Sequence, residues 1–294
     1  MSCQRNLFFV TVNYFSSQLI KELIVSIQSN INCDPQLVIV NNSPTDTELI
    51  KLSKENQSIK IIEAKDNLGF AKACNIAINY IYSSDSQALI WLINPDATLD
   101  SDAISNVLQC LKKDESIAIL GTKIRDSQGN IWFSHGSLNR YLGWAKHEKR
   151  DCQKTQEIPI KTMTTKWVCG CSLIINLSQF DHCPQFDDNY FLYGEDLDFC
   201  EKYNHLNYHI AITNQALVTH KVSKIIGKNF FNLYKNYTFS RLYFINKNAS
   251  QLALYIYIVY TLFKVVTTFI KKPLNAKGRL AGINKFLNIF HLKK

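Results

Sequence analysis

The sequence predicts an α/β protein with a parallel sheet in its first 220 residues and a basic helical extension after them. Short runs of β-branched and aromatic residues alternate with helical patterns in the first part, and strands that alternate with helices at this spacing form parallel sheets. The charge divides at the same point. Of the 33 Lys and Arg residues, 14 follow residue 220 and no Asp or Glu does, which leaves 19 basic and 24 acidic residues before it, a formal charge of −5.

The predicted elements follow one another with short connections. Buried strands are expected at 7–13, 36–42, 59–64 and 88–94, with helices at 16–30, 45–56, 67–82 and near 101–113. A further strand is expected at 166–176, and two short closing strands at 208–213 and 216–220. The polar stretch 137–160, rich in Lys, Arg and His, is expected to be a loop in the position of a substrate lid.

Composition narrows the class of protein. With 46% hydrophobic and 19% charged residues, the chain is expected to fold and not to be disordered. Its nine cysteines are odd in number and scattered, and the close pair Cys169 and Cys171 lacks zinc-knuckle spacing. Reduced thiols in the cytosol are therefore expected. The apolar run 7–12 leads directly into strand and helix patterns, so no cleavable signal is expected.

The ends of the predicted parallel strands are polar. They comprise Asn13, Asn41 with Asn42, residues 65–67, and residues 94–96. Ligands of such sheets bind beyond the carboxyl ends of the strands. A nucleotide site needs polar side chains there, although loops are polar in general, so the pattern indicates a site without naming its ligand.

Three features could carry chemistry. Asp96 follows a strand so apolar that it must be buried, and a carboxylate there either binds a hard divalent cation or makes a turn. His220 ends the last predicted strand, as a metal ligand or as an ordinary core or surface histidine. Glu195, Asp196 and Asp198 lie within four positions of each other, either because acids favour the first turn of a helix or because a reaction needs them.

Several common site types are missing from the sequence. The loop "DNLGFAKACN" lacks G-x-G-x-x-G spacing, and no G-x-x-x-x-G-K-[ST] occurs. Dinucleotide and P-loop nucleotide sites are therefore disfavoured. No Gly-x-Ser-x-Gly elbow occurs, and no local context supports a cysteine nucleophile.

Seven motifs occur in a characteristic order: "FVTVNYFS", "VIVNNSPTD", "NLGFAKACNIAI", "LINPDATL", "CGCSLIIN", "FLYGEDLDFCEK" and "ALVTHKVS". Together, over residues 6–245, they resemble the family 2 glycosyltransferases and in particular the rhamnosyltransferase-like branch. The resemblance implies a GT-A fold over residues 1–220. A nucleotide-sugar half would occupy 1–120, an acceptor half 121–220, and the helical extension 221–294.

The resemblance also implies an activity: inverting, metal-dependent transfer of a sugar from a nucleotide sugar to a polysaccharide or a lipid-linked glycan. The branch suggests rhamnose as the sugar. A metal neutralises the departing diphosphate, and a carboxylate must take the proton of the acceptor hydroxyl.

The resemblance further implies roles for particular residues. Asp96 would be the acid of a Mn²⁺ or Mg²⁺ site and His220 its distal ligand. Asp196 would be the catalytic base, Glu195 a neighbour that orients it or contacts the acceptor, and Asp198 a helix-dipole residue. The implied donor-site residues are Asn13, Asn41, Asn42, Asn67, Gly69, Asn94 and Asp96.

Three positions depart from the family pattern. Asn41 stands where many relatives have Asp, Asn94 occupies the first acidic position of D-x-D, and Cys74 stands where relatives often have a basic or small residue. These departures leave Asp96 as the only carboxylate of its motif. An alternative function is therefore a catalytically degenerate protein of this fold that binds anionic surfaces.

The extension contains a long apolar helix at 252–270, with Lys264 inside it on a strip with Tyr257, Thr261 and Thr268. A second apolar face beside many cations follows within 274–294. These patterns fit a helix packed on protein, a helix in the membrane interface or, less well, a transmembrane hairpin. Peripheral binding to the cytosolic membrane face through 252–294 is expected, and nucleic acid is not expected as a partner.

Overall fold

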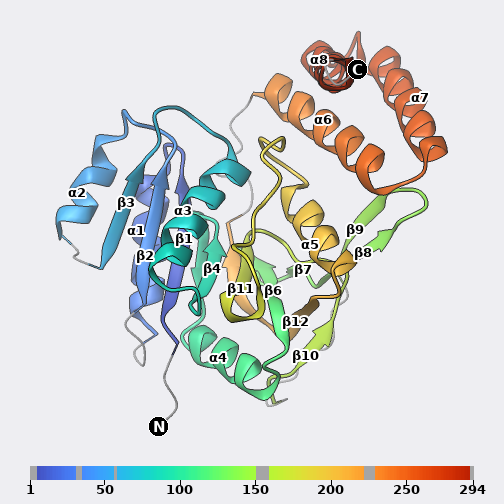
Figure 1. Ribbon diagram of the computed structural model, residues 1–294. Helices are drawn as coiled ribbons and strands as arrows, with labels where there is room; N and C mark the ends of the chain where they lie inside the picture. Colours follow the sequence, from blue (N-terminus) through green and yellow to red (C-terminus); the bar gives the residue numbers. More distant parts are fainter. Residues whose placement is uncertain (1–4, 31–34, 56–57, 150–158, 222–228, 292–294) are drawn as a thin grey trace.

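The computed structural model describes residues 5–30, 35–55, 58–149, 159–221 and 229–291. The main sheet is mixed and has the strand order β10-β12-β6-β11-β4-β1-β2-β3. Figure 1 shows this sheet with helices packed around it and a group of C-terminal helices at one end. The predicted α/β class and the helical C-terminal part are both confirmed.

The first half of the chain forms the parallel part of the sheet. Its elements are β1 (Leu7–Asn13), α1 (Ser17–Gln28), β2 (Gln36–Asn41), α2 (Thr47–Glu55), β3 (Ile59–Glu63), α3 (Phe70–Ser84), β4 (Leu89–Ile93) and α4 (Ala103–Lys113). β1 lies between β2 and β4 and is parallel to both. Every residue of β1 is buried, which explains why its sequence is a continuous apolar run and does not alternate.

The second half completes the sheet and adds a helix. Its elements are β5 (Ala97–Leu99), β6 (Ile117–Asp126), β7 (Ile131–Phe133), β10 (Thr162–Thr164), β11 (Ser172–Asn176), the 3₁₀ helix η1 (Leu177–Gln179), α5 (Glu195–His205) and β12 (His209–His220). β11 runs antiparallel between β4 and β6. The two closing strands predicted separately are one strand, β12, whose pairing with β6 shifts register between Ile212 and Val218.

The stretch 137–160, predicted as a loop, contains an antiparallel hairpin of β8 (His135–Asn139) and β9 (Trp144–Glu148). Residues 150–158 of this stretch lie outside the described residues. Trp167 holds the hairpin in place, because its Nε1 donates to Ser137 O at 3.2 Å and its carbonyl accepts from Gly136 N at 3.2 Å. β9 is largely exposed, so it lacks the apolar alternation that would have predicted a strand.

The core lies between the central strands and the helices that cover them. Trp91 on β4 is fully buried, stacks on Phe9 at 5.1 Å between ring centroids, and donates to Ser172 Oγ at 3.0 Å. A buried indole needs such a partner for its N–H. The hydrogen bond therefore fixes the start of β11 against β4.

Three helices follow the sheet: α6 (Phe230–Asn248), α7 (Gln251–Thr268) and α8 (Pro273–His291). α8 approaches α6 closely at Gly278 and Gly282. A Cβ at Gly278 would lie 2.5 Å from Phe231 O, and one at Gly282 would lie 2.6 Å from Lys235 O. Only glycine permits this approach, so the sequence "GRLAG" determines how tightly the two helices pack.

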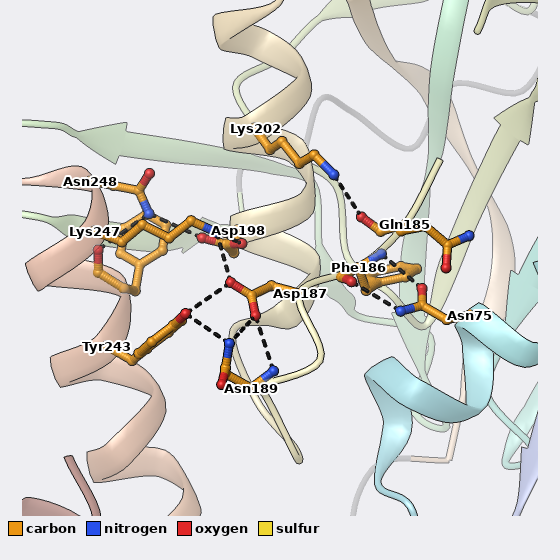
Figure 2. Close-up of polar contacts among 11 residues, drawn as sticks. Asn75, Gln185, Phe186, Asp187, Asn189, Asp198, Lys202, Tyr243, Lys247 and Asn248 are labelled. Atoms are coloured by element: carbon orange, nitrogen blue, oxygen red, sulfur yellow. Dashed lines mark hydrogen bonds and ion pairs between the residues drawn. The ribbon is translucent and has the colours of Figure 1, made fainter. Parts of the chain in front are cut away.

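Helix α6 is fastened to the sheet half by polar side chains. Lys247 Nζ lies 2.9 Å from Asp187 Oδ2 and 2.7 Å from Asp198 Oδ2. Tyr243 donates to Asp187 at 3.0 Å, and Asn248 donates to Asp198 at 3.1 Å. Figure 2 shows these side chains reaching from α6 to α5 and to the loop that precedes it.

Candidate active site

The ends of β1 and β2 are joined by an asparagine network. Asn13 pairs with Asn41 across the two strands, and its Nδ2 lies 3.0 Å from acceptors on Asn41, Ser43 and Asp46. Asn13 Oδ1 accepts from the backbone and hydroxyl of Ser16. Both asparagines are fully buried. Their side-chain amides therefore hold the ends of β1 and β2 together beneath the predicted donor site. They have no free hydrogen-bonding group.

Asn42, Asn67 and Gly69 form the next part of this edge. Asn42 Nδ2 donates to Gly69 O at 3.0 Å, and Gly69 N donates to Asn67 Oδ1 at 3.0 Å. Asn42 Oδ1 is buried without a partner among the described residues, so it is an acceptor free for a ligand. Hydrogen bonds thus link five of the residues predicted for the donor site, and the unpaired buried atom belongs to Asn42 and not to Asn41.

Gly69 connects this edge to the acidic cluster. Its φ is +80°, and a Cβ would lie 2.3 Å from Phe191 O. The next residue, Phe70, donates its N–H to the same Phe191 oxygen at 2.8 Å. The loop before α5 is therefore held against the first turn of α3.

Asp96 and His220, 124 positions apart, meet at the other side of the site. His220 Nε2 lies 3.0 Å from Asp96 Oδ1 and 3.5 Å from Asn94 Nδ2. Both are buried, and His220 Nδ1 has no partner among the described residues. β5, which follows Asp96, pairs with the end of β12, with Ala97 opposite His220. This pairing brings the two side chains together.

These side chains fit a divalent cation in part. A carboxylate oxygen and an imidazole nitrogen are suitable ligands, and Mg²⁺ or Mn²⁺ is usually completed by water and substrate phosphates. In the described part of the chain, no group of three or more His, Cys, Asp and Glu side chains is arranged around one point. A cation here would therefore need ligands from the substrate.

The turn Cys169 to Ser172 lies between Asp96 and the acidic cluster. Asp196 Oδ2 accepts from Gly170 N at 2.9 Å, and its Oδ1 accepts from Leu197 N at 2.8 Å. Burial raises the pKa of the Cys171 thiol, and the charges of Asp96 and Asp196 raise it further. Asn94 N donates to Cys171 O at 3.2 Å, so the segment that carries Asp96 and the carboxylate of Asp196 both contact this turn.

Glu195 and Asp198 are placed differently from Asp196, although all three are in the first turn of α5. Burial, and then the charge of Asp196, raise the pKa of Glu195 to about 8. Its Oε2 has no partner among the described residues. Asp198 points to α6 and is 1% exposed. It is thus an ion-pair residue of the α5–α6 contact in addition to the helix-dipole residue that was predicted.

Sequence reasoning missed an aromatic group on the hairpin side. The Trp132 ring lies 4.8 Å from the His220 ring and 5.5 Å from the His147 ring, and His147 lies 4.9 Å from Trp167. The surrounding protein lowers the pKa of His147, whereas the Asp196 charge raises it. The histidine therefore lies near the acidic cluster. It was missed because β9 was predicted as part of a loop.

Comparison with known proteins places this geometry in a family. Residues 8–169 match the model of "Glycosyl transferase family 2". The chain is 21% identical over 237 residues to N-acetylglucosaminyl-diphospho-decaprenol L-rhamnosyltransferase of Mycobacterium tuberculosis. The aligned region covers 75% of this chain and 77% of that protein.

Two solved structures share the fold. The mannosyltransferase PcManGT of Pyrobaculum calidifontis, in complex with GDP-Man and Mn²⁺, has a TM-score of 0.58 at 11% identity and covers 97% of this chain and 88% of that chain. S. aureus TarS 1-349 in complex with UDP-GlcNAc has a TM-score of 0.55 at 15% identity, covering 82% of this chain and 66% of that chain. Because the family model matches more than half of the sequence, this chain belongs to glycosyl transferase family 2 and is a glycosyltransferase.

Proposed function

We propose that this chain transfers a sugar with inversion from a nucleotide sugar to a polysaccharide or lipid-linked glycan. The observation that carries the proposal is the arrangement of two carboxylates around one turn. Asp96 is paired with His220 at 3.0 Å, and Asp196 is held by Gly170 N at 2.9 Å. Glycosyl transfer needs a site for the diphosphate and a base for the acceptor, and the two acids can serve these two needs.

In the proposed mechanism, Asp196 takes the proton of the acceptor hydroxyl as the hydroxyl oxygen attacks the sugar carbon. The bond between that carbon and the diphosphate breaks, and its electron pair leaves with the diphosphate. The hydrogen bond from Gly170 fixes the direction of the Asp196 carboxylate. Asp96 and His220 would hold Mn²⁺ or Mg²⁺, which supplies positive charge for the departing diphosphate.

The names of the similar proteins support the substrate classes. The mycobacterial protein is named as an L-rhamnosyltransferase that acts on a diphospho-decaprenol glycan, and TarS and PcManGT are in complex with UDP-GlcNAc and GDP-Man. We therefore infer a nucleotide-sugar donor, with a rhamnosyl donor as the first to test, and a lipid-linked acceptor. The free acceptor oxygen of Asn42 is a candidate contact for the donor.

A nucleotide-release assay tests the proposal. Purified protein is incubated with a panel of nucleotide sugars, with and without Mn²⁺, together with a lipid-linked glycan acceptor. We expect release from one donor only when metal is present. Asp196→Asn should lower kcat by roughly 10²–10⁴-fold, and Asp96→Ala should abolish the metal dependence. Glu195→Gln should retain much more activity than Asp196→Asn, because Glu195 is already largely protonated at neutral pH.

A catalytically degenerate protein that binds anionic surfaces is the second candidate function. It is favoured by Asn94, which leaves one carboxylate in its motif, and by the basic extension. No donor binding by calorimetry, combined with no release across the panel, would favour this candidate over the transferase.

We further infer that the enzyme works at a membrane, with α7 in the bilayer interface. In the part of the chain that is described, α7 is the one helix long and apolar enough to cross a bilayer. Its polar strip faces the protein: Thr261 is 3% exposed, and Arg241 lies 5.8 Å from the Tyr257 ring. The outward face consists of the exposed residues Leu252, Tyr255, Ile256, Val259, Tyr260, Leu262, Phe263, Val266, Phe269 and Ile270.

The charges around this outward face indicate that it binds an anionic bilayer. The face is flanked by the exposed cations Lys271, Lys272 and Lys277, and no acid occurs after residue 220. An anionic bilayer provides both an apolar phase and negative headgroups, and each basic residue near its surface contributes about 1 kcal/mol. A peripheral location at the cytosolic face is consistent with a lipid-linked acceptor.

A further inference from the structure

Two lysines of the C-terminal helices, Lys235 and Lys285, line one hollow outside the carboxylate site. Lys72 is in the first turn of α3, Lys235 is on α6 and Lys285 is on α8. Burial lowers the pKa of Lys285, and the charges of Lys235 and Lys72 lower it further. In a solvated protein, one charge changes the pKa of another only at short range, because water and salt screen it. Lys285 is therefore surrounded by like charge, and Lys235 lines the same hollow as Lys285.

No carboxylate compensates this cluster. Within the described ranges, none of the eleven ion pairs includes Lys72, Lys235 or Lys285. The two helices that supply Lys235 and Lys285 belong to the part of the chain without any Asp or Glu. Cations that are held together without a counter-charge repel one another, and a bound anion would remove that repulsion.

The packing of the helices holds the cluster together. The close contact of Gly282 with the Lys235 carbonyl brings α8 against α6. Lys285 Nζ lies 4.0 Å from the centre of the Phe239 ring, a cation–π contact that fixes the ammonium group. Both lysines are half-buried. Their positions are thus set by neighbouring elements and differ from those of freely rotating surface lysines.

A hollow of about 370 Å³ lies beside the cluster and is lined by Lys235, Ala281, Asn284, Lys285, Asn288 and Ile289. Asn284 and Asn288 are one turn apart on α8, and both line the hollow together with Lys285. The hollow therefore offers ammonium and amide N–H donors together, and no carboxylate lines it. Lysine binds phosphate as a point charge, and amides add directed hydrogen bonds.

We propose that Lys235 and Lys285, with Asn284 and Asn288, form a phosphate-binding site between α6 and α8. The ligand class is a phosphate or diphosphate group. In the reaction proposed above, such a group occurs in the soluble nucleotide diphosphate and in the phosphate of a lipid-linked acceptor. The choice of these two sources rests on the proposed function. In either case the site would couple α8 to substrate binding.

The test measures binding and not turnover. The full chain is titrated with inorganic pyrophosphate in one arm. In a second arm it is sedimented with phosphatidylcholine vesicles, with and without phosphatidic acid. We expect Lys235→Gln and Lys285→Gln each to weaken binding by about tenfold in at least one arm. Lys112→Gln on α4 removes the same charge from an exposed position, and it should leave both arms unchanged.

Each outcome decides the proposal. Loss of binding in the pyrophosphate arm supports the site and names a soluble diphosphate, and loss in the phosphatidic acid arm alone names a lipid phosphate. If Lys285→Gln fails to fold, Asn288→Ala replaces it, because Asn288 lines the hollow and is exposed on α8. Equal binding of the variants and the parent in both arms overturns the proposal. No sugar or acceptor is present, so this failure is distinct from failure of the transferase reaction.

Discussion

Glu195 and Asp196 are neighbours in the sequence but have opposite surroundings. Asp196 is half-buried and accepts two backbone N–H bonds. Glu195 is 7% exposed and its Oε2 has no partner among the described residues. Burial and the Asp196 charge therefore favour its protonated form. The pair thus offers one carboxylate that is oriented by backbone N–H groups and one whose protonated form is favoured mainly by burial.

Glu195 should make stability fall as pH rises. Its pKa is about 8 in the folded chain against a usual 4.5, so between these values the folded state keeps a proton that the unfolded state has released. Stability from this proton is complete below about 4.5 and is lost as pH approaches 8. Glu195→Gln removes the titration. We expect its Tm to exceed that of the parent increasingly across this range.

The measurement is thermal unfolding followed by circular dichroism at several pH values between these limits. Glu115→Gln, at an exposed position, serves as the control and should follow the parent. Parallel pH curves for Glu195→Gln and the parent would show that Glu195 is not neutral in the folded state.

The sequence predicted which residues form this site better than how they act. Polar strand ends meet at one sheet edge, and for this reason Asn13, Asn42 and Asp96 could be named from the strands alone. The pairing of Asp96 with His220 depends on the contact of β5 with β12, which only the family resemblance suggested. The internal bonds of Asn41 and the position of His147 depend on tertiary packing and were not predicted.

At the scale of elements, α6 illustrates what periodicity cannot show. The sequence predicts a helical extension over 221–294, but it does not predict that Lys247 reaches two carboxylates. The position of α6 is set by Asp187 and Asp198, which precede and begin α5 (Figure 2). Burial raises the pKa of Asp198 and Lys247 opposes this effect. The charge of Asp198 is therefore tolerated because α6 is docked.

Lys247→Met should destabilise the chain because it leaves Asp198 buried without a counter-charge. Breaking a buried pair costs about 3–5 kcal/mol. We expect about 2 kcal/mol here, because Lys247 is 35% exposed and water screens part of the charge. Urea unfolding measures the difference. Lys146→Met, which breaks the exposed pair with Glu148, is the matched control and should cost below about 1 kcal/mol. Equal losses for the two variants would contradict this account of α6.

The hairpin of β8 and β9 shows that sequence patterns also fail to predict strands whose order comes from tertiary contacts. The buried strands of the parallel sheet were predicted because burial on both faces selects continuous β-branched runs. Trp144 is 65% exposed, and β9 as a whole is polar, so burial leaves no pattern in its sequence. Its order comes from pairing with β8 and from Trp167. Those contacts link residues that are distant in the chain.

At the scale of the whole molecule, the excess of positive charge and the large exposed apolar surface both lie on the C-terminal helices. Figure 1 shows α6, α7 and α8 grouped at one end, with α7 at the outside of the group. The predicted polar strip of α7 does face the protein, and the apolar strip faces outward. In a soluble bundle, the apolar strip of a helix would face the protein and the polar strip would face the solvent. This orientation supports the proposal of an interfacial helix, and α7 contacts both α6 and α8.

Removing part of the outward face should weaken membrane binding without unfolding the chain. Phe263 and Val266 are 62% and 75% exposed, so Phe263→Ser with Val266→Ser removes apolar surface that contributes little to the fold. Burying such side chains in lipid yields about 1 kcal/mol or more each, and the double variant should bind anionic vesicles at least about tenfold more weakly. Flotation with phosphatidylcholine and phosphatidylglycerol vesicles measures this. Binding of the parent should decrease with added salt, because part of the attraction is electrostatic.

Two controls separate a bilayer from other occupants of this face. Val25→Ser on α1 removes an apolar residue of similar exposure, 63%, at a site away from the extension, and it should float like the parent. Analytical ultracentrifugation without lipid tests whether a second copy of the chain covers the face. A dimer that Phe263→Ser with Val266→Ser dissociates would replace the bilayer with a second copy. A monomer whose flotation this double variant abolishes would place α7 at the lipid surface.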